Sequence, residues 1–192
     1  MLVKSIRSVP DEIFLPALAE IESIKWDTIA DAARHSTVFD TSTAIHIRAH
    51  KVGNRPRPTT VNEWSVITEC VDKPYNAAAY PMVYATANWM STQVNGIALG
   101  RVMIVKLVPQ GIVALHVDPL DYFAMYSRFH VPFRTNPGVI FSGGPGTVDE
   151  HMPQQHISQL NNRLPHMLAN NSNDYRIHLI VDIALDGGNQ IF

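Results

Sequence analysis

Apolar residues recur at helical spacing in two segments of the first half of the chain. Between residues 10 and 25 they return every three or four positions, which predicts an amphipathic helix. Ser8 precedes this segment as a candidate cap, and Pro10 suits the first turn. A second helix is predicted over residues 80–93, with Pro81 in its first turn. Each helix has one apolar face, so each needs an apolar partner.

The rest of the pattern has a period of two, which predicts strands. Residues 43–49 alternate between apolar and polar side chains. From Gly100 onward, short segments of this kind are separated by breaks rich in Gly, Pro and Asn, which are turn formers. These segments cover residues 101–108, 112–116, 124–133, 138–142, 155–160, 165–169 and 175–183.

Eight predicted strands suit a double-sheet jelly roll. A doubly wound α/β fold would need helices between the strands, and no helical stretch separates them here. We therefore predict a mainly β fold, a cupin-like double-stranded β-helix backed by N-terminal helices. We expect one domain over residues 1–192, with residues 1–95 as mixed helical support and residues 97–185 as the jelly-roll core.

Composition excludes several classes of protein. The chain has 192 residues, of which 46% are hydrophobic, and a net charge of -2, so intrinsic disorder is excluded. With 15 basic and 17 acidic residues, a broad electrostatic grip on nucleic acid is not expected. The single cysteine, Cys70, forms no internal disulfide and is expected to be a small buried hydrophobe. No apolar run of about 20 residues and no signal peptide are visible, so we expect a cytoplasmic protein without membrane contact.

Two predicted strands carry polar side chains on one face. Arg128 and His130 share a face of the strand over residues 124–133, while Arg176, His178 and Asp182 share a face of the last strand. In a half-exposed sheet such a face meets water. Alternatively, the apolar faces pack against the helices and the polar faces line a ligand cavity inside the roll.

The sequence His116-Val117-Asp118 is a candidate metal motif. A strand places residues i and i+2 on the same side, so both side chains can reach one ion. A second histidine from a distant strand would complete a 2-His-1-carboxylate triad, which is typical of non-haem Fe(II) oxygenases. His166 is the best candidate. The motif alone is weak evidence, since about one chance occurrence in two such chains is expected.

Other polar and aromatic residues have competing interpretations. The region of His151 and His156, with Asp149 or Glu150, offers a different metal site. His46 and Arg48 could face the mouth of a cavity or simply meet water. The aromatic residues that could line a substrate entrance, although core positions are more usual, are Trp89, Tyr122 and Tyr126. The segment Arg55–Pro58 is expected to be a loop with solvated arginines.

Over about residues 97–183, and more loosely over residues 35–50, the sequence resembles the aspartyl/asparaginyl β-hydroxylase family of Fe(II)- and 2-oxoglutarate-dependent oxygenases. Residues 152–155 depart from the family pattern, which has a Gly-Glu turn there. The segments that carry the resemblance are Leu107–Asp118 (LVPQGIVALHVD), Ser127–Pro132 (SRFHVP), Asn161–His166 (NNRLPH) and Arg176–Asp182 (RIHLIVD).

The resemblance implies roles for individual residues. His116, Asp118 and His166 would bind Fe(II). Arg176 would bind the distal carboxylate of the co-substrate 2-oxoglutarate, because a buried guanidinium needs an anionic partner and matches a carboxylate well.

The resemblance also implies that Arg128 and His130 contact 2-oxoglutarate. O₂ would be the third reactant. The substrate would be an amino-acid residue in a peptide or protein, or a free amino acid such as proline. A jelly roll that binds a metal or an acidic metabolite without catalysis is the alternative from another functional class.

Overall fold

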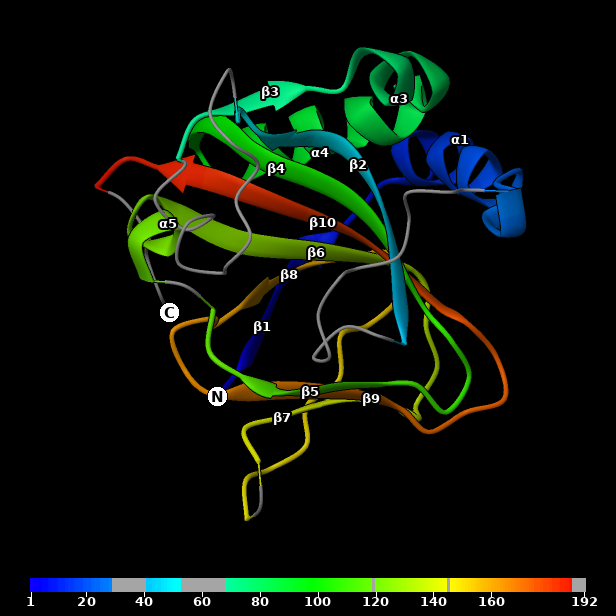
Figure 1. Ribbon diagram of the computed structural model, residues 1–192, viewed down its shortest axis with the longest axis vertical. Helices are drawn as coiled ribbons and strands as arrows, with labels where there is room; N and C mark the ends of the chain where they lie inside the picture. Colours follow the sequence, from blue (N-terminus) through cyan, green and yellow to red (C-terminus); the bar gives the residue numbers. More distant parts are fainter. Residues whose placement is uncertain (29–40, 53–67, 119, 145, 188–192) are drawn as a thin grey trace.

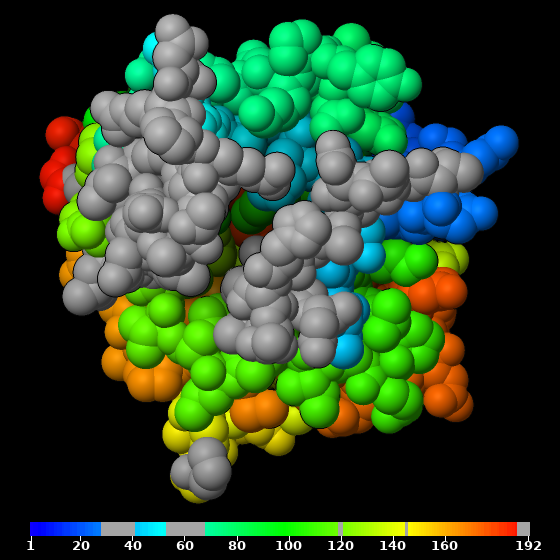
Figure 2. Space-filling model, viewed as in Figure 1, coloured from blue at the N-terminus to red at the C-terminus, as the bar shows by residue number. Residues whose placement is uncertain are grey.

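The computed structural model describes residues 1–28, 41–52, 68–118, 120–144 and 146–187 (Figure 1 and Figure 2). Its helices are α1 (Asp11–Glu22), the short 3₁₀ helix η1 (Trp26–Thr28), α3 (Pro74–Ala79), α4 (Pro81–Gln93) and α5 (Leu120–Met125). Its strands are β1 (Val3–Ser8), β2 (Ser42–His50), β3 (Cys70–Asp72), β4 (Gly96–Leu107), β5 (Ile112–His116), β6 (Tyr126–Arg134), β7 (Val139–Ser142), β8 (His156–Leu160), β9 (His166–Asn170) and β10 (Arg176–Leu185).

The strands form two antiparallel sheets. The large sheet has the order β1-β8-β6-β10-β4-β2-β3, and the small sheet has the order β5-β9-β7. Figure 1 shows the small sheet beneath the large one, with α1, α3 and α4 gathered at the opposite side of the large sheet. The predicted mainly β jelly roll with helical support is therefore confirmed.

The outer face of the large sheet is apolar because it is the packing surface of the helices. Alternate side chains of β6 and β10, such as Val131 and Leu179, belong to one buried cluster with residues of α1 and α4. Within that cluster Phe14 of α1 stacks on Phe133 of β6, with ring centroids 4.8 Å apart. None of the described helices is long and apolar enough to cross a membrane.

The beginning of the predicted strand over residues 124–133 is wrong. Leu120–Met125 forms α5, and β6 starts only at Tyr126. The side chains of Tyr122 and Phe123 are buried in a cluster with Tyr126. A short apolar run is compatible with either a buried helix or a buried strand, so periodicity alone could not separate them.

Two strands were not predicted, and one helix cap differs from the expectation. β1 pairs with β8 but exposes most of its side chains, and β3 has only three residues, so neither strand has a strong alternating pattern in the sequence. Ser8 ends β1 and does not cap α1. Pro10 is the cap residue of α1, and no side chain caps this helix.

The Phe14–Phe133 stack predicts a sharp contrast between two neighbouring positions. Phe14 is 2% exposed whereas Leu15, on the other side of α1, is 54% exposed. Phe14→Ala should lower the free energy of unfolding by about 3–5 kcal/mol because it leaves a cavity, and Leu15→Ala should change it by less than about 1 kcal/mol. Urea unfolding measures both. Equal losses for the two variants would contradict this packing.

Candidate active site

Three potential metal ligands meet where the small sheet faces the large one. His116 ends β5 and pairs with His166, which begins β9. Asp118 follows two residues after β5 ends. One ligand atom from each of these three side chains lies within 4.8 Å of the other two, and His116 Nε2 is 3.8 Å from Asp118 Oδ1. The structure thus brings together the His-x-Asp pair and the distant histidine selected from the sequence.

Both histidines are oriented by backbone carbonyl groups. Nδ1 of His116 is 2.8 Å from the oxygen of Ala114, and Nδ1 of His166 is 2.9 Å from the oxygen of Leu164. A carbonyl oxygen only accepts hydrogen bonds, so each Nδ1 donates and the lone pair is on Nε2. This is the tautomer that a metal ion requires when a second partner fixes the ring. Burial lowers the pKa of His166, which keeps it neutral.

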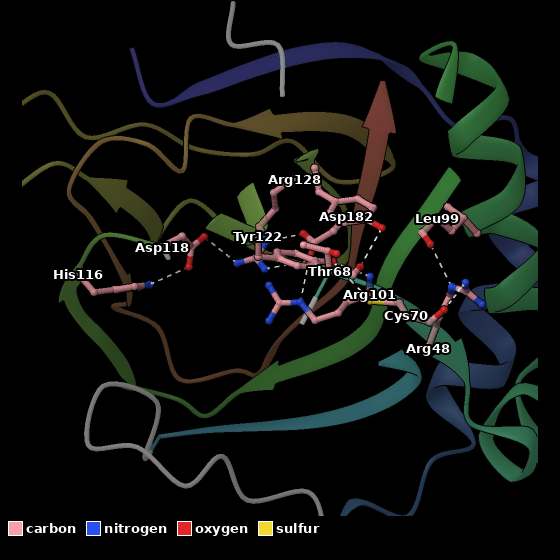
Figure 3. Close-up of polar contacts among 11 residues, drawn as sticks. Arg48, Thr68, Cys70, Leu99, Arg101, His116, Asp118, Tyr122, Arg128 and Asp182 are labelled. Carbon is pink, nitrogen blue, oxygen red and sulfur yellow. Dashed lines mark hydrogen bonds and ion pairs between the residues drawn. The ribbon is translucent and has the colours of Figure 1, made fainter. Parts of the chain in front are cut away.

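Arg128 of β6 connects Asp118 to the large sheet. Its Nη1 donates to Asp118 Oδ2 at 3.0 Å, while Nε and Nη2 donate to the two oxygens of Asp182 at 2.8 and 3.1 Å. Arg128 and Asp182 stand opposite each other in the β6–β10 register. Figure 3 shows this chain of contacts from His116 through Asp118 and Arg128 to Asp182.

The charge of Asp182 is compensated on two sides. Burial alone would raise its pKa, but the guanidinium groups of Arg128 and Arg101 reverse this and hold the pKa below its usual value. Arg101 of β4 donates through Nε to Asp182 Oδ2 at 2.9 Å. Arg101 was not expected at the site from the sequence. Arg101 shares one face of an alternating apolar strand with Met103 and Val105, and it is the charged residue among these three. A charge on an otherwise apolar face could have marked Arg101 as a site residue.

A second polar group lies deeper on the inner face of the large sheet. Arg176, His178 and His130 are each at most 3% exposed. Nη2 of Arg176 donates to His178 Nδ1 at 2.6 Å and lies 3.5 Å from His130 Nδ1. Burial and the nearby Arg176 charge hold the pKa values of both histidines well below the usual value, so both are neutral.

The histidines of this group have hydrogen-bonding capacity left over. Because Nδ1 of His178 accepts from Arg176, its proton is on Nε2. Nε2 of His178 and Nε2 of His130 are buried and make no hydrogen bond with the described residues. A buried cation beside the buried N–H of His178 fits a ligand carboxylate, which would satisfy both.

The alternative metal site does not form among the described residues. The carboxylate of Glu150 accepts hydrogen bonds from the backbone N–H groups of Leu2 and Val3, and Nδ1 of His151 bonds the carbonyl oxygen of Val139. In the described part of the chain, His116, Asp118 and His166 form the cluster with metal-ligand geometry.

The remaining candidate residues lie as follows. Trp89 of α4 is partly buried against the core between the helices and the large sheet, whereas Tyr122 and Tyr126 are buried with Cys70 beside Arg101. Arg48 forms an ion pair with Asp72, away from the triad. The segment Arg55–Pro58 lies outside the described residues.

Solved structures share this fold. An oxidoreductase of the 2OG-Fe(II) oxygenase family from Burkholderia pseudomallei matches with a TM-score of 0.57 and 12% identity over 91% of this chain and 82% of that chain. A prolyl-4-hydroxylase from Pseudomonas putida matches with a TM-score of 0.52 and 11% identity, covering 96% and 92% of the two chains. A prolyl hydroxylase from Trichoplax adhaerens, solved with a peptide fragment, matches with a TM-score of 0.54 and 9% identity, covering 97% and 85%.

The fold is similar to that of solved 2OG-Fe(II) oxygenases, and it carries a His-Asp-His cluster with metal-ligand geometry. The sequence pattern that describes the aspartyl/asparaginyl β-hydroxylase family matches residues 24–185, and the chain belongs to this family. No curated protein matches the sequence. The family implies an enzyme that uses Fe(II) and 2-oxoglutarate to hydroxylate its substrate.

The buried neutral histidines predict how stability depends on pH. An unfolded chain protonates its histidines below their ordinary pKa of about 6.5. The folded protein does not protonate His130 and His178 there, because their pKa values are depressed. Stability of the metal-free protein should therefore be full above about pH 6.5 and should fall as the pH is lowered below it.

Thermal unfolding of the metal-free protein between pH 8 and pH 5 measures this dependence. His178→Asn removes one of the buried groups and should flatten the slope below pH 6.5. His156→Asn changes a histidine near the surface, whose Nδ1 bonds the carbonyl oxygen of Gln154, and should leave the slope unchanged. If the wild type and His178→Asn have the same slope, the assignment of a neutral buried His178 is wrong.

Proposed function

We propose that this protein hydroxylates an unactivated C–H bond of an amino-acid residue in a peptide or protein. Fe(II) would be the metal, and 2-oxoglutarate and O₂ would be co-substrates. One O₂ would be consumed: one oxygen atom would enter the C–H bond, and the other would enter the succinate that forms when 2-oxoglutarate loses CO₂. The observation that carries the proposal is the triad of His116, Asp118 and His166, with ligand atoms within 4.8 Å of one another on the inner side of the roll.

The residues fit the metal and the co-substrate. Two neutral imidazoles and one carboxylate are the ligand set of non-haem Fe(II) oxygenases, and this set leaves coordination positions open. When bound, iron and 2-oxoglutarate supply the oxidising chemistry, and the protein orients them and excludes water. The buried group of Arg176, His178 and His130 would hold the distal carboxylate of 2-oxoglutarate, to which it offers the cation of Arg176 and the N–H of His178.

Arg128 would have two tasks in this arrangement. It holds Asp118 in place through the 3.0 Å contact with Oδ2. Its Nη1 and Nη2 each carry a second N–H, and we infer that these contact 2-oxoglutarate together with His130. The whole chain would act as one oxygenase domain, in which the helices support the large sheet from outside.

A free amino acid such as proline is the second candidate substrate. The likeness to solved prolyl hydroxylases is a likeness of fold, and it does not choose between a peptide and a free amino acid. A non-catalytic metal or metabolite binder is the candidate from another class. Release of succinate in the presence of each candidate substrate separates these three possibilities. A binder releases no succinate, whereas an enzyme releases it faster with its own substrate, whether that is a peptide or a free amino acid.

The metal assignment predicts a visible absorption band. Anaerobic addition of Fe(II) and 2-oxoglutarate to the wild type should produce the weak charge-transfer band of a chelated 2-oxoacid. His116→Ala and His166→Ala should each abolish it, because each removes a ligand. His156→Ala should retain the band. A wild type without the band, or a band that survives unchanged in His116→Ala, would refute the iron site.

The co-substrate assignment predicts a selective loss of 2-oxoglutarate affinity. Arg176→Gln removes a buried charge that would pair with a carboxylate, so the dissociation constant should rise by about 10- to 100-fold. Arg134→Gln, which changes a half-exposed arginine at the far end of β6, should leave it unchanged. Titration of the anaerobic Fe(II) protein measures both, and equal affinities in the two variants would contradict the role of Arg176.

A further inference from the structure

Arg101 lies on the inner face of β4 with Met103 and Val105, beside a bulge in this strand. In the pairing with β10, Val102 stands opposite Val181 and Leu99 stands opposite Ile183, so β4 has one residue more than β10 at this point. Gly100 and Arg101 therefore share the position opposite Asp182. A bulge of this kind is common beside active sites.

Gly100 makes this geometry possible. A Cβ atom there would lie 2.9 Å from a ring carbon of Tyr126 and closer still to the hydroxyl of Tyr122. The Tyr122 hydroxyl accepts a hydrogen bond from the backbone N–H of Arg101 at 3.0 Å. Close packing of Tyr122 over Gly100 thus fixes the backbone from which the Arg101 side chain extends.

The guanidinium of Arg101 is anchored at one edge, and its far edge makes no hydrogen bond with the described residues. Its Nε is bound to Asp182, and its central carbon lies 4.6 Å from the ring centroid of Tyr122 and 5.4 Å from that of Phe123. Neither terminal nitrogen makes a hydrogen bond with the described residues, and the side chain is 17% exposed. Four N–H donors on a fixed plane are therefore available.

These donors face the metal side of the site. Figure 3 shows the guanidinium of Arg101 beside that of Arg128, with its terminal nitrogens on the side of Asp118 and His116. Burial alone would lower the pKa of Arg101, but Asp182 and, more weakly, Asp118 raise it, so the group is charged and within electrostatic reach of the triad.

Among the described residues, the guanidinium groups of the assembled site outnumber its carboxylates by one. In the part of the chain that the structure describes, three guanidinium groups (Arg101, Arg128 and Arg176) accompany two carboxylates (Asp118 and Asp182). Fe(II) and the dianion of 2-oxoglutarate cancel each other. A single negative charge on the substrate would therefore neutralise the site.

We propose that Arg101 binds a carboxylate of the substrate and so selects acidic substrates, either through the α-carboxylate of a free amino acid or through an acidic side chain in a peptide. The inference rests on the proposed function, since it places the substrate beside the triad. A planar guanidinium that is fixed through Nε and by its contacts with two aromatic rings can offer its terminal nitrogens to a carboxylate in a bidentate pair, which an amide cannot match.

Binding of defined probes to the anaerobic Fe(II)·2-oxoglutarate protein tests this, with ligand-observed NMR as the readout. One arm compares a pool of free L-amino acids with the same pool as α-amides. The other arm compares N-acetylated, C-terminally amidated aspartate and glutamate with the asparagine and glutamine equivalents. In at least one arm, the wild type should bind the carboxylate probes about tenfold more tightly or better. The arm that shows this preference identifies the source of the carboxylate.

Arg101→Gln should abolish the preference and leave 2-oxoglutarate affinity within about twofold of the wild type. Arg128 still pairs with Asp182 in this variant, and 2-oxoglutarate binding reports that the site is intact. Arg101→Lys, which keeps the charge but loses the fork, should retain only part of the preference and serves as the second variant. Arg48→Gln removes an arginine that is likewise paired with an aspartate but lies away from the triad, and should change nothing.

Three results would overturn the proposal. The first is a wild type that binds 2-oxoglutarate but prefers the carboxylate probes in neither arm. The second is a preference for carboxylate probes that persists in Arg101→Gln. The third is a loss of 2-oxoglutarate affinity in both Arg101 variants although both are folded. Failure of the wild type to bind Fe(II) and 2-oxoglutarate at all is a separate result. It would refute the proposed function, and this inference with it, before any probe is added.

Discussion

The buried ion pair between Arg128 and Asp182 is the contact on which the geometry of the site depends. Both side chains belong to the centre of the large sheet, they stand opposite each other across β6 and β10, and Asp182 is 0% exposed. Breaking a pair of this kind typically costs about 3–5 kcal/mol, because the remaining charge stays buried. Through Arg128 the pair positions Asp118, which follows the small sheet, and through Arg101 it continues to β4. One carboxylate thus aligns a candidate metal ligand and a candidate substrate contact.

The large sheet can hold this network because its two faces have different tasks. On β10, Leu179 and Val181 point outward into the core beneath α1 and α4, while Arg176, His178 and Asp182 point inward. The apolar face contributes the folding energy, so the polar face is available for charged groups that burial alone would disfavour. The same division explains why both histidines of the inner group are neutral. Both histidines are buried next to the guanidinium of Arg176, and burial and this charge both disfavour the protonated form.

Much of this arrangement was predictable from the sequence, and the exceptions have identifiable causes. The alternation in β6 and β10 predicts the inward polar faces, and His116-x-Asp118 with His166 predicts the ligand cluster that the structure brings together. The residues of α5 were predicted in part as strand because a short buried apolar run has no distinguishing period. The role of Arg101 was missed because alternation gives the face on which it lies but not its partner Asp182. Which residue of β10 stands opposite Arg101 depends on strand pairing, and this leaves no mark in the pattern of a single strand.

X-ray absorption at the iron edge tests the central claim most directly, since it reports the atoms around the metal. We predict that the anaerobic Fe(II) protein shows two imidazole ligands and otherwise oxygen ligands, and that 2-oxoglutarate changes the oxygen shell while both imidazoles remain. His166→Ala should remove one imidazole. A wild-type spectrum without imidazole scattering, or one that 2-oxoglutarate leaves unchanged, would contradict the assignment of His116, Asp118 and His166 as the metal site of this oxygenase.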